Sequence, residues 1–162
     1  MEIRILKNEE FDELKNGIQY SFQNGFERYF GKTDEIIIPD KDIIESYKND
    51  KAITFVALID GNIVGGAIVN VDGTFAHLDI LYVKVGYEGK GIGFKLWNYI
   101  ERYFKDVKIW HTCTPYFDQR NIYFYLNKCH FKAVEFIREI NEDGFIGDHG
   151  EGMFEFEKII ND

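Results

Sequence analysis

Residues 52–83 contain three β-rich runs separated by two Asp-Gly pairs, and this stretch constrains the fold more than any other part of the sequence. It reads AITFVALIDGNIVGGAIVNVDGTFAHLDILYV, with the pairs at Asp60-Gly61 and Asp72-Gly73. Asp-Gly favours tight two-residue hairpin turns, because the central residues of such turns need positive φ. The stretch therefore predicts an antiparallel meander of three strands.

Helical and extended patterns on both sides of the meander predict one α+β domain over residues 1–162. The helix that follows IIIPD has Asp40 as its expected N-cap. Apart from the meander, the expected strands are residues 2–7, 106–113, 131–137 and 152–160, and the expected helices are residues 8–30, 41–50, 91–104 and 118–130.

Composition narrows the classes of function. A hydrophobic content of 45% over 162 residues is enough to bury a core. The net charge of −9 argues against nucleic acid and is compatible with a cationic or amine partner, although acidity also serves solubility alone. Two cysteines without a CxxC pair argue against a disulfide scaffold and a metal site.

Two features of the sequence indicate the cellular compartment: the first residues of the chain and the length of its apolar runs. MEIRILKNEEFDEL lacks the basic and apolar segments of a signal peptide. No apolar run approaches the roughly 20 residues that cross a bilayer. A cytoplasmic protein that does not contact membranes is expected.

Directly after the meander, residues 83–97 read VKVGYEGKGIGFKLW and place four glycines before a helical pattern. Glycine inside a helix costs about 1 kcal/mol relative to alanine, so another requirement must favour it here. A strand, a glycine-rich turn and a helix N-terminus together expose unpaired N–H groups that bind phosphate. Neither the GxxxxGK[ST] loop nor the GxGxxG fingerprint is present. A turn that serves only chain geometry is the alternative.

Two motifs in this chain resemble the GNAT superfamily of acyl-CoA-dependent N-acyltransferases. LYVKVGYEGKGIGFKLW resembles its acyl-CoA-binding motif, with Val83 at the valine position, Glu88 at the Gln/Arg position, and Gly91 and Gly93 as the glycines. RNIYFYLNKCHF resembles the later N-x-x-F-Y…GF segment. In this chain Glu88 replaces Gln or Arg, and His130-Phe131 replaces GF one residue later than usual.

The resemblance implies a mixed, mostly antiparallel sheet that splays between strands 4 and 5, with helices on both faces. It implies acetyl-CoA as co-substrate in the gap, with pantetheine along the fourth strand, the pyrophosphate on the glycine-turn amides, and the Glu88 side chain turned away. The implied cofactor-binding residues are Leu81, Val83, Glu88, Gly89, Lys90, Gly91, Ile92, Gly93, Asn121 and Tyr125.

The resemblance also implies direct attack by an amine in a ternary complex, with the Val83 N–H polarising the thioester carbonyl. Tyr125 is the expected acid for the leaving thiol, and Tyr123 is the fallback because of the shifted GF position. Some family members carry a glutamate base on the fourth strand, and the corresponding position here is His77. Asp79 follows it on the same strand, and a base that acts through water is the alternative.

Strict alternation along the fourth strand predicts which of its side chains share a face. One face is expected to carry Phe75, His77, Asp79, Leu81 and Val83, and the other Ala76, Leu78, Ile80 and Tyr82.

The remaining reactive side chains are assigned structural roles. His111 is expected near the splay as a packing residue, and His149 in solvent. Cys113 and Cys129 are expected to be small buried groups, because the sequence identifies no base for a cysteine nucleophile.

Acceptor recognition in this family comes from the first two helices and from the loop between the last two strands. Here the candidate acceptor residues are Tyr20, Phe22, Phe26, Tyr29 and Phe30 on the first helix, and Glu142, Asp143, Asp148 and Glu151 in the loop.

Three hypotheses follow. The first is an acetyl-CoA-dependent N-acetyltransferase that acts on a primary amine. The second is a non-catalytic acyl-CoA-binding sensor or assembly module on the same fold. The third is an unrelated phosphate-ligand enzyme, which would prefer a nucleotide without pantetheine. Homodimers are common in the resembled family, and no sequence feature establishes one here.

Overall fold

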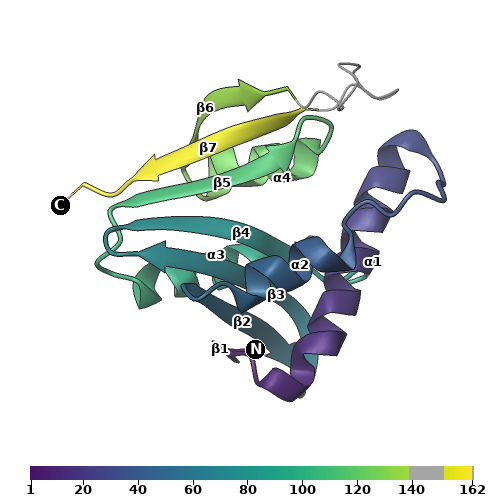
Figure 1. The fold of residues 1–162 in the computed structure, drawn as a ribbon, viewed down its shortest axis with the longest axis horizontal. Coiled ribbons are helices and arrows are strands. Elements are labelled where there is room, and N and C mark those ends of the chain that lie inside the picture. The colour runs from purple at the N-terminus through teal and green to yellow at the C-terminus, as the bar shows by residue number, and fades with distance from the viewer. Residues whose placement is uncertain (139–151, 162) are drawn as a thin grey trace.

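The computed structural model describes residues 1–138 and 152–161, and these form a seven-stranded mixed sheet with helices on both faces (Figure 1). The strands are β1 (Glu2–Ile5), β2 (Ala52–Ile59), β3 (Asn62–Asp72), β4 (Phe75–Val83), β5 (Ile109–Pro115), β6 (Lys132–Ile137) and β7 (Met153–Ile159). The helices are α1 (Phe11–Phe30), α2 (Asp40–Lys48), α3 (Ile92–Tyr103) and α4 (Gln119–Tyr123), with a 3₁₀ turn η1 (Asn8–Glu10) and a π-helical turn η2 (Phe124–Lys128). The expected α+β class is confirmed.

The strand order is β1-β2-β3-β4-β5-β7-β6, and β4–β5 is its parallel pair. Antiparallel pairing of β2 with β3 and of β3 with β4 confirms the predicted meander. At the first turn, Asp60 has φ 51° and Gly61 φ 79°. Positive φ at both positions is the requirement that made Asp-Gly informative in the sequence.

The sheet splays between β4 and β5, as expected. Their pairing runs from Phe75 opposite Ile109 to Leu78 opposite Thr112, after which both strands continue without pairing to each other. At this last pair, the buried Thr112 hydroxyl donates a 2.8 Å hydrogen bond to the Leu78 carbonyl. Figure 1 shows the two strands separating toward the C-terminal end of β4.

A bulge at Asp79 makes the predicted alternation along β4 wrong. Ile68 of β3 pairs with Ile80, but the next residue, Val69, pairs with Leu78 and leaves Asp79 as the extra residue. An extra residue in one strand exchanges the two faces beyond it. The first half of β4 therefore points Leu78 toward α3, whereas the second half points Ile80 toward α1 and α2.

Two core layers hold the helices against the sheet. On one face, Leu96, Trp97 and Ile100 of α3 pack with Trp110 of β5. On the other face, Leu14 and Ile18 of α1 and Ile43 of α2 pack on the sheet. All seven side chains are almost completely buried. At roughly 1.5–3 kcal/mol for each large apolar side chain, this burial fixes the helices on both sides of the splay.

The expected N-cap role of Asp40 is wrong. Helix α2 begins at Asp40, and Pro39, which is extended at φ −67° and ψ 152°, takes the cap position. The Asp40 carboxylate instead accepts from Lys15 of α1 at 3.3 Å. Acidic side chains in the first turn still stabilise α2, because they interact favourably with the positive end of the helix dipole.

Among residues 1–138 and 152–161, no helix combines the length and hydropathy that crossing a bilayer requires.

Candidate functional site

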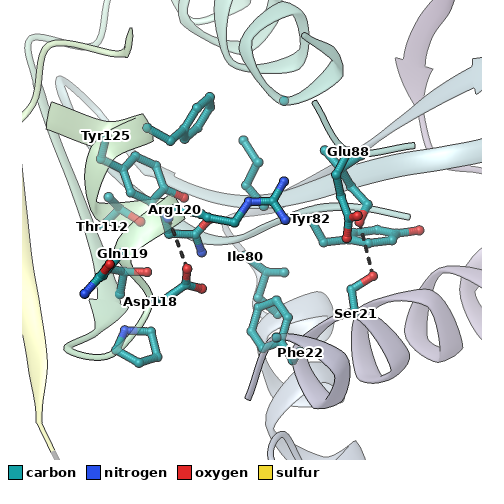
Figure 2. A pocket seen from close by; sticks show the side chains of 18 of the residues that line it. Ser21, Phe22, Ile80, Tyr82, Glu88, Thr112, Asp118, Gln119, Arg120 and Tyr125 are labelled. Atoms are coloured by element: carbon teal, nitrogen blue, oxygen red, sulfur yellow. Dashed lines mark hydrogen bonds between the residues drawn. The ribbon is translucent and has the colours of Figure 1, made fainter. Parts of the chain in front are cut away.

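A cavity of about 1260 Å³ follows the splay between β4 and β5. It is larger than the roughly 300–1,000 Å³ of ordinary small-ligand pockets. Its walls come from α1, the second half of β4, the glycine turn with the start of α3, the end of β5, and α4 with η2. Figure 2 shows Ser21, Tyr82 and Glu88 on one side of the cavity and Thr112, Asp118 and Tyr125 on the other.

The open edge of β4 presents backbone groups to this cavity. The Lys84 N–H donates to Val64 of β3, so the alternate residues Val83 and Leu81 direct their backbone groups to the opposite edge. The Val83 carbonyl accepts a 3.2 Å hydrogen bond from the Ser21 hydroxyl of α1, which agrees with its pointing away from β3. An extended ligand placed here can pair with the strand as an added strand does.

The glycine turn ends at the N-terminus of α3. Gly89 has φ 74°, and Gly91, the N-cap of the helix, has φ 79°. Side chains rarely tolerate this left-handed region, so chain geometry alone accounts for both glycines. The first turn of α3 contains no acidic residue. No side chain of the helix itself therefore neutralises the positive end of the helix dipole, which faces the cavity.

Gly93 is different. It lies inside α3 with ordinary helical backbone, and a Cβ added there would meet Phe124 and Val83 at 3.5 Å, which is normal van der Waals contact. The fold therefore does not require glycine at this position. Because Gly93 lines the cavity, its missing side chain instead leaves room for a ligand to approach the helix amides.

Glu88 is paired across the cavity with a residue that the sequence did not single out. Its Oε1 lies 3.6 Å from Nη2 of Arg28, near the end of α1. Both residues line the cavity, and the Arg28 guanidinium compensates the carboxylate beside the helix N-terminus. Lys90, by contrast, does not line the cavity; its ammonium lies 5.2 Å above the ring of Tyr87.

The later motif lies on the opposite wall, where a π-helical turn follows α4. The Cys129 N–H donates to the Phe124 carbonyl at 3.0 Å, closing a wide turn that accommodates one extra residue. This turn explains why His130-Phe131 stands one residue later than the common motif. Asn121, Tyr123 and Tyr125 all line the cavity.

The two tyrosines differ in environment. Tyr125 is 4% exposed and Tyr123 is 56% exposed. Burial raises the pKa of the Tyr125 hydroxyl above its usual value of 10, so the phenol keeps its proton throughout the neutral range. A protonated, buried phenol facing the cavity can act as an acid.

His77 and Asp79 are joined beside the apex of the splay. The His77 Nδ1 lies 2.6 Å from Oδ1 of Asp79, whose other oxygen accepts from Ser46 at 2.6 Å and from Asn70. The hydrogen bond to Asp79, with a smaller contribution from Cys113, raises the pKa of His77 to about 9. Asp79 lines the cavity, whereas His77 does not.

Aromatic side chains connect α1 with the segment after β5. Phe117 lies 5.5 Å from Phe26, 5.7 Å from Tyr29 and 5.2 Å from Phe30, measured between ring centroids. These rings join the two sides of the splay at one end of the cavity. The sequence pointed to the α1 aromatics, but nothing in it indicated Phe117.

Not all the candidate acceptor residues reach the cavity. Phe22, Phe26 and Tyr29 line it, whereas Tyr20 is 64% exposed and lies outside it. Phe30 does not line it, but its ring packs on Phe26 and Phe117, which do. The acidic candidates Glu142, Asp143, Asp148 and Glu151, together with His149, lie outside the described residues.

The remaining histidine and cysteines divide between core, surface and cavity. His111 lies between Glu155 at 3.0 Å and Glu157 at 2.8 Å and does not line the cavity. Cys129 is buried in the core, as expected. Cys113 is only partly buried and lines the cavity, so the expectation of a buried packing group is wrong for it.

Asp118 and Arg120 also line the cavity. Arg120 opens the quoted RNIYFYLNKCHF segment, but neither residue was a candidate site residue. Asp118 caps α4 by accepting a 3.1 Å hydrogen bond from the Asn121 N–H, and burial raises the pKa of its carboxyl group. Among the described residues, no group of three or more His, Cys, Asp and Glu side chains could hold a metal ion.

Comparison with known proteins agrees with this geometry. Residues 14–131 match the family model described as the acetyltransferase (GNAT) family. The chain is 35% identical over 163 residues to the uncharacterized protein YrkN of Bacillus subtilis, covering 99% of this chain and 87% of that protein.

Solved structures resemble it in fold. The ribosomal-protein-S18-alanine N-acetyltransferase of Escherichia coli superposes with a TM-score of 0.76 at 15% identity, covering 99% of this chain and 94% of that one. PaiA N-acetyltransferase of Thermoplasma acidophilum, solved in complex with coenzyme A, superposes with a TM-score of 0.71 at 20% identity, covering 99% and 100%.

Proposed function

This chain belongs to the GNAT family of acetyltransferases, and we propose that it is an N-acetyltransferase that moves an acetyl group from acetyl-CoA to a primary amine. The observation that carries the proposal is the cavity that runs from the glycine turn along the open edge of β4 to the splay. A helix N-terminus preceded by a glycine turn and a strand edge without a partner strand, both in one cavity, suit a ligand with a pyrophosphate and an amide-bearing arm.

The proposed coenzyme position follows from these groups. The pyrophosphate contacts the amides from Gly89 to Gly93, and the pantetheine arm pairs with the backbone of Leu81 and Val83. Asn121 contacts the same arm from the other wall. In support, nine of the ten cofactor-binding residues expected from the sequence line the cavity, Lys90 being the exception, and one structural neighbour was solved with coenzyme A.

The proposed reaction is direct attack of the amine on the thioester in a ternary complex. An alkyl amine has a pKa of about 10.4 and a thiol about 8.5, so both proton transfers benefit from help near neutral pH. The His77–Asp79 pair accepts the amine proton, directly or through water. The Val83 N–H stabilises the oxyanion, and Tyr125 protonates the departing sulfur.

The acceptor enters from the side of α1. Phe22, Phe26, Tyr29 and Phe117 make that end of the cavity apolar, which suits an amine attached to an apolar or aromatic group. The chain's net charge of −9 further favours a cationic acceptor.

Titration calorimetry with acetyl-CoA, with ATP and NAD as controls, tests the coenzyme site, and thiol release with a panel of primary amines tests turnover. We expect micromolar binding of acetyl-CoA alone and thiol release with at least one amine. Binding without turnover on any amine would point to a non-catalytic acyl-CoA-binding module. Absence of binding would reject the proposal.

A further inference from the structure

We propose that Cys113 is a second acyl acceptor in this cavity, which takes the acetyl group from acetyl-CoA as a protein thioester when no amine occupies the acceptor side. The inference rests on the proposed acetyl-CoA site. It goes beyond direct transfer because it assigns a covalent acyl-enzyme form to the protein.

The position of Cys113 carries the first part of the argument. It follows Thr112, the last residue of β5 that pairs with β4, so it stands where the two strands begin to separate. Its side chain is partly exposed and lines the cavity. A thiol at the apex of the splay lies where the two walls of the cavity meet.

Its neighbours carry the second part. His77 is the direct partner of His111 across the β4–β5 pair, and Cys113 lies two residues beyond His111 on the same face of β5. This register sets Cys113 beside His77, whose Nδ1 lies 2.6 Å from Oδ1 of Asp79. A thiol, an imidazole and a carboxylate in this order are the groups that activate a nucleophilic cysteine.

The other cysteine provides an internal contrast. Cys129 is 1% exposed, belongs to the core beneath α3 and does not line the cavity. Burial raises the pKa of its thiol to about 12, so it stays protonated and inaccessible. Of the chain's two cysteines, Cys113 alone combines access to the cavity with an imidazole.

The chemical step balances without an oxidant or a reductant. The Cys113 sulfur attacks the thioester carbonyl carbon, and its proton passes by way of the His77 imidazole to the sulfur of CoA. The bond between the acetyl carbon and the CoA sulfur breaks, leaving free CoA and an acetyl thioester on Cys113. One thioester is exchanged for another, so excess free CoA should reverse the reaction.

Intact-mass spectrometry of the full-length protein after incubation with acetyl-CoA, without amine, tests the proposal. We expect one added acetyl group that is lost on treatment with hydroxylamine or excess free CoA, and peptide mapping should place it on Cys113. The Cys129→Ala variant should label like the wild type, Cys113→Ala should not label, and His77→Ala should label about 100-fold more slowly.

The outcomes separate this inference from the proposed function. An unlabelled wild-type protein that still acetylates an amine would overturn the Cys113 assignment alone, as would a label mapped to another residue. No labelling together with no acetyl-CoA binding would overturn both. If Cys113→Ala does not fold, peptide mapping of the wild type still decides which residue carries the label.

Discussion

Nη2 of Arg28 lies 3.6 Å from Oε1 of Glu88, which ties the end of α1 to the glycine turn at the N-terminus of α3. The pair is partly exposed, at 40% and 29% of the two side chains, so it contributes little to stability. Its importance is electrostatic: the guanidinium offsets a carboxylate at the position where the resembled motif carries Gln or Arg.

We therefore expect Arg28→Met to weaken acetyl-CoA binding several-fold by leaving the Glu88 charge uncompensated near the pyrophosphate. The double variant Arg28→Met/Glu88→Gln should regain most of the loss, with a coupling energy of about 0.5–1 kcal/mol. Calorimetry of the four proteins in the cycle measures it. Additive effects of the two substitutions would show that the pair does not act together on the ligand.

Gly91→Glu should abolish acetyl-CoA binding, because it places a carboxylate among the amides proposed to bind the pyrophosphate. Any side chain at φ 79° is also strained, by about 1–2 kcal/mol. Gly91→Ala shares that strain without the charge and is the matched control. We expect similar melting temperatures for the two variants and retained affinity in Gly91→Ala only. Wild-type affinity in Gly91→Glu would contradict the pyrophosphate position.

His77 should titrate near pH 9, because the hydrogen bond to Asp79 and the nearby Cys113 favour the imidazolium. His111, its partner on β5, also faces it. Since the folded pKa lies above the unfolded value of about 6.5, the pairing stabilises the fold fully below pH 6.5, and this contribution is lost as pH rises through 9.

An NMR titration of the imidazole signals, with His77→Gln to assign them, measures this pKa. Asp79→Asn should lower the midpoint by about 1–3 pH units. A wild-type midpoint near 6.5 would show that Asp79 does not hold the proton on His77. If His77 is the base, the rate of amine acetylation should rise with pH up to about 9.

Tyr125→Phe should lower turnover about 10²–10⁴-fold with little change in acetyl-CoA affinity, because the phenol hydroxyl is lost while the ring packing is kept. The ring contacts Phe131 and Phe156 at 5.6 and 5.7 Å between centroids. Tyr123→Phe removes the same atom from the exposed tyrosine of the cavity wall and should be nearly silent. Steady-state kinetics of both variants decides between them, and the reverse ranking would assign the acid to Tyr123.

The faces of β4 show where prediction from sequence failed. Alternation is a local rule, and it holds up to Leu78. The bulge at Asp79 arises because Ile68 and Val69 of β3 pair with residues of β4 that are two positions apart. The pairing register between strands is a property of the sheet, and the sequence of residues 75–83 alone does not indicate it.

The second motif shows the same limit. The sequence revealed that His130-Phe131 comes one residue late, but not where the extra residue is accommodated. The structure places it in the π-helical turn at Phe124–Lys128, which keeps Tyr125 buried against Phe156 of β7. A helix and a π-turn differ by one residue in hydrogen-bond spacing, and packing on both sides selects between them.

The sequence by itself determined the meander, the order of elements and the glycine turn before α3. These depend on local requirements: positive φ at Asp60-Gly61 and Gly91, and apolar periodicity along each helix. Only the tertiary structure decided which distant side chains meet. Arg28 reaches Glu88, Phe117 reaches α1, and His77 meets Asp79 close to Cys113, because strand register and helix packing bring these residues together irrespective of their separation along the chain.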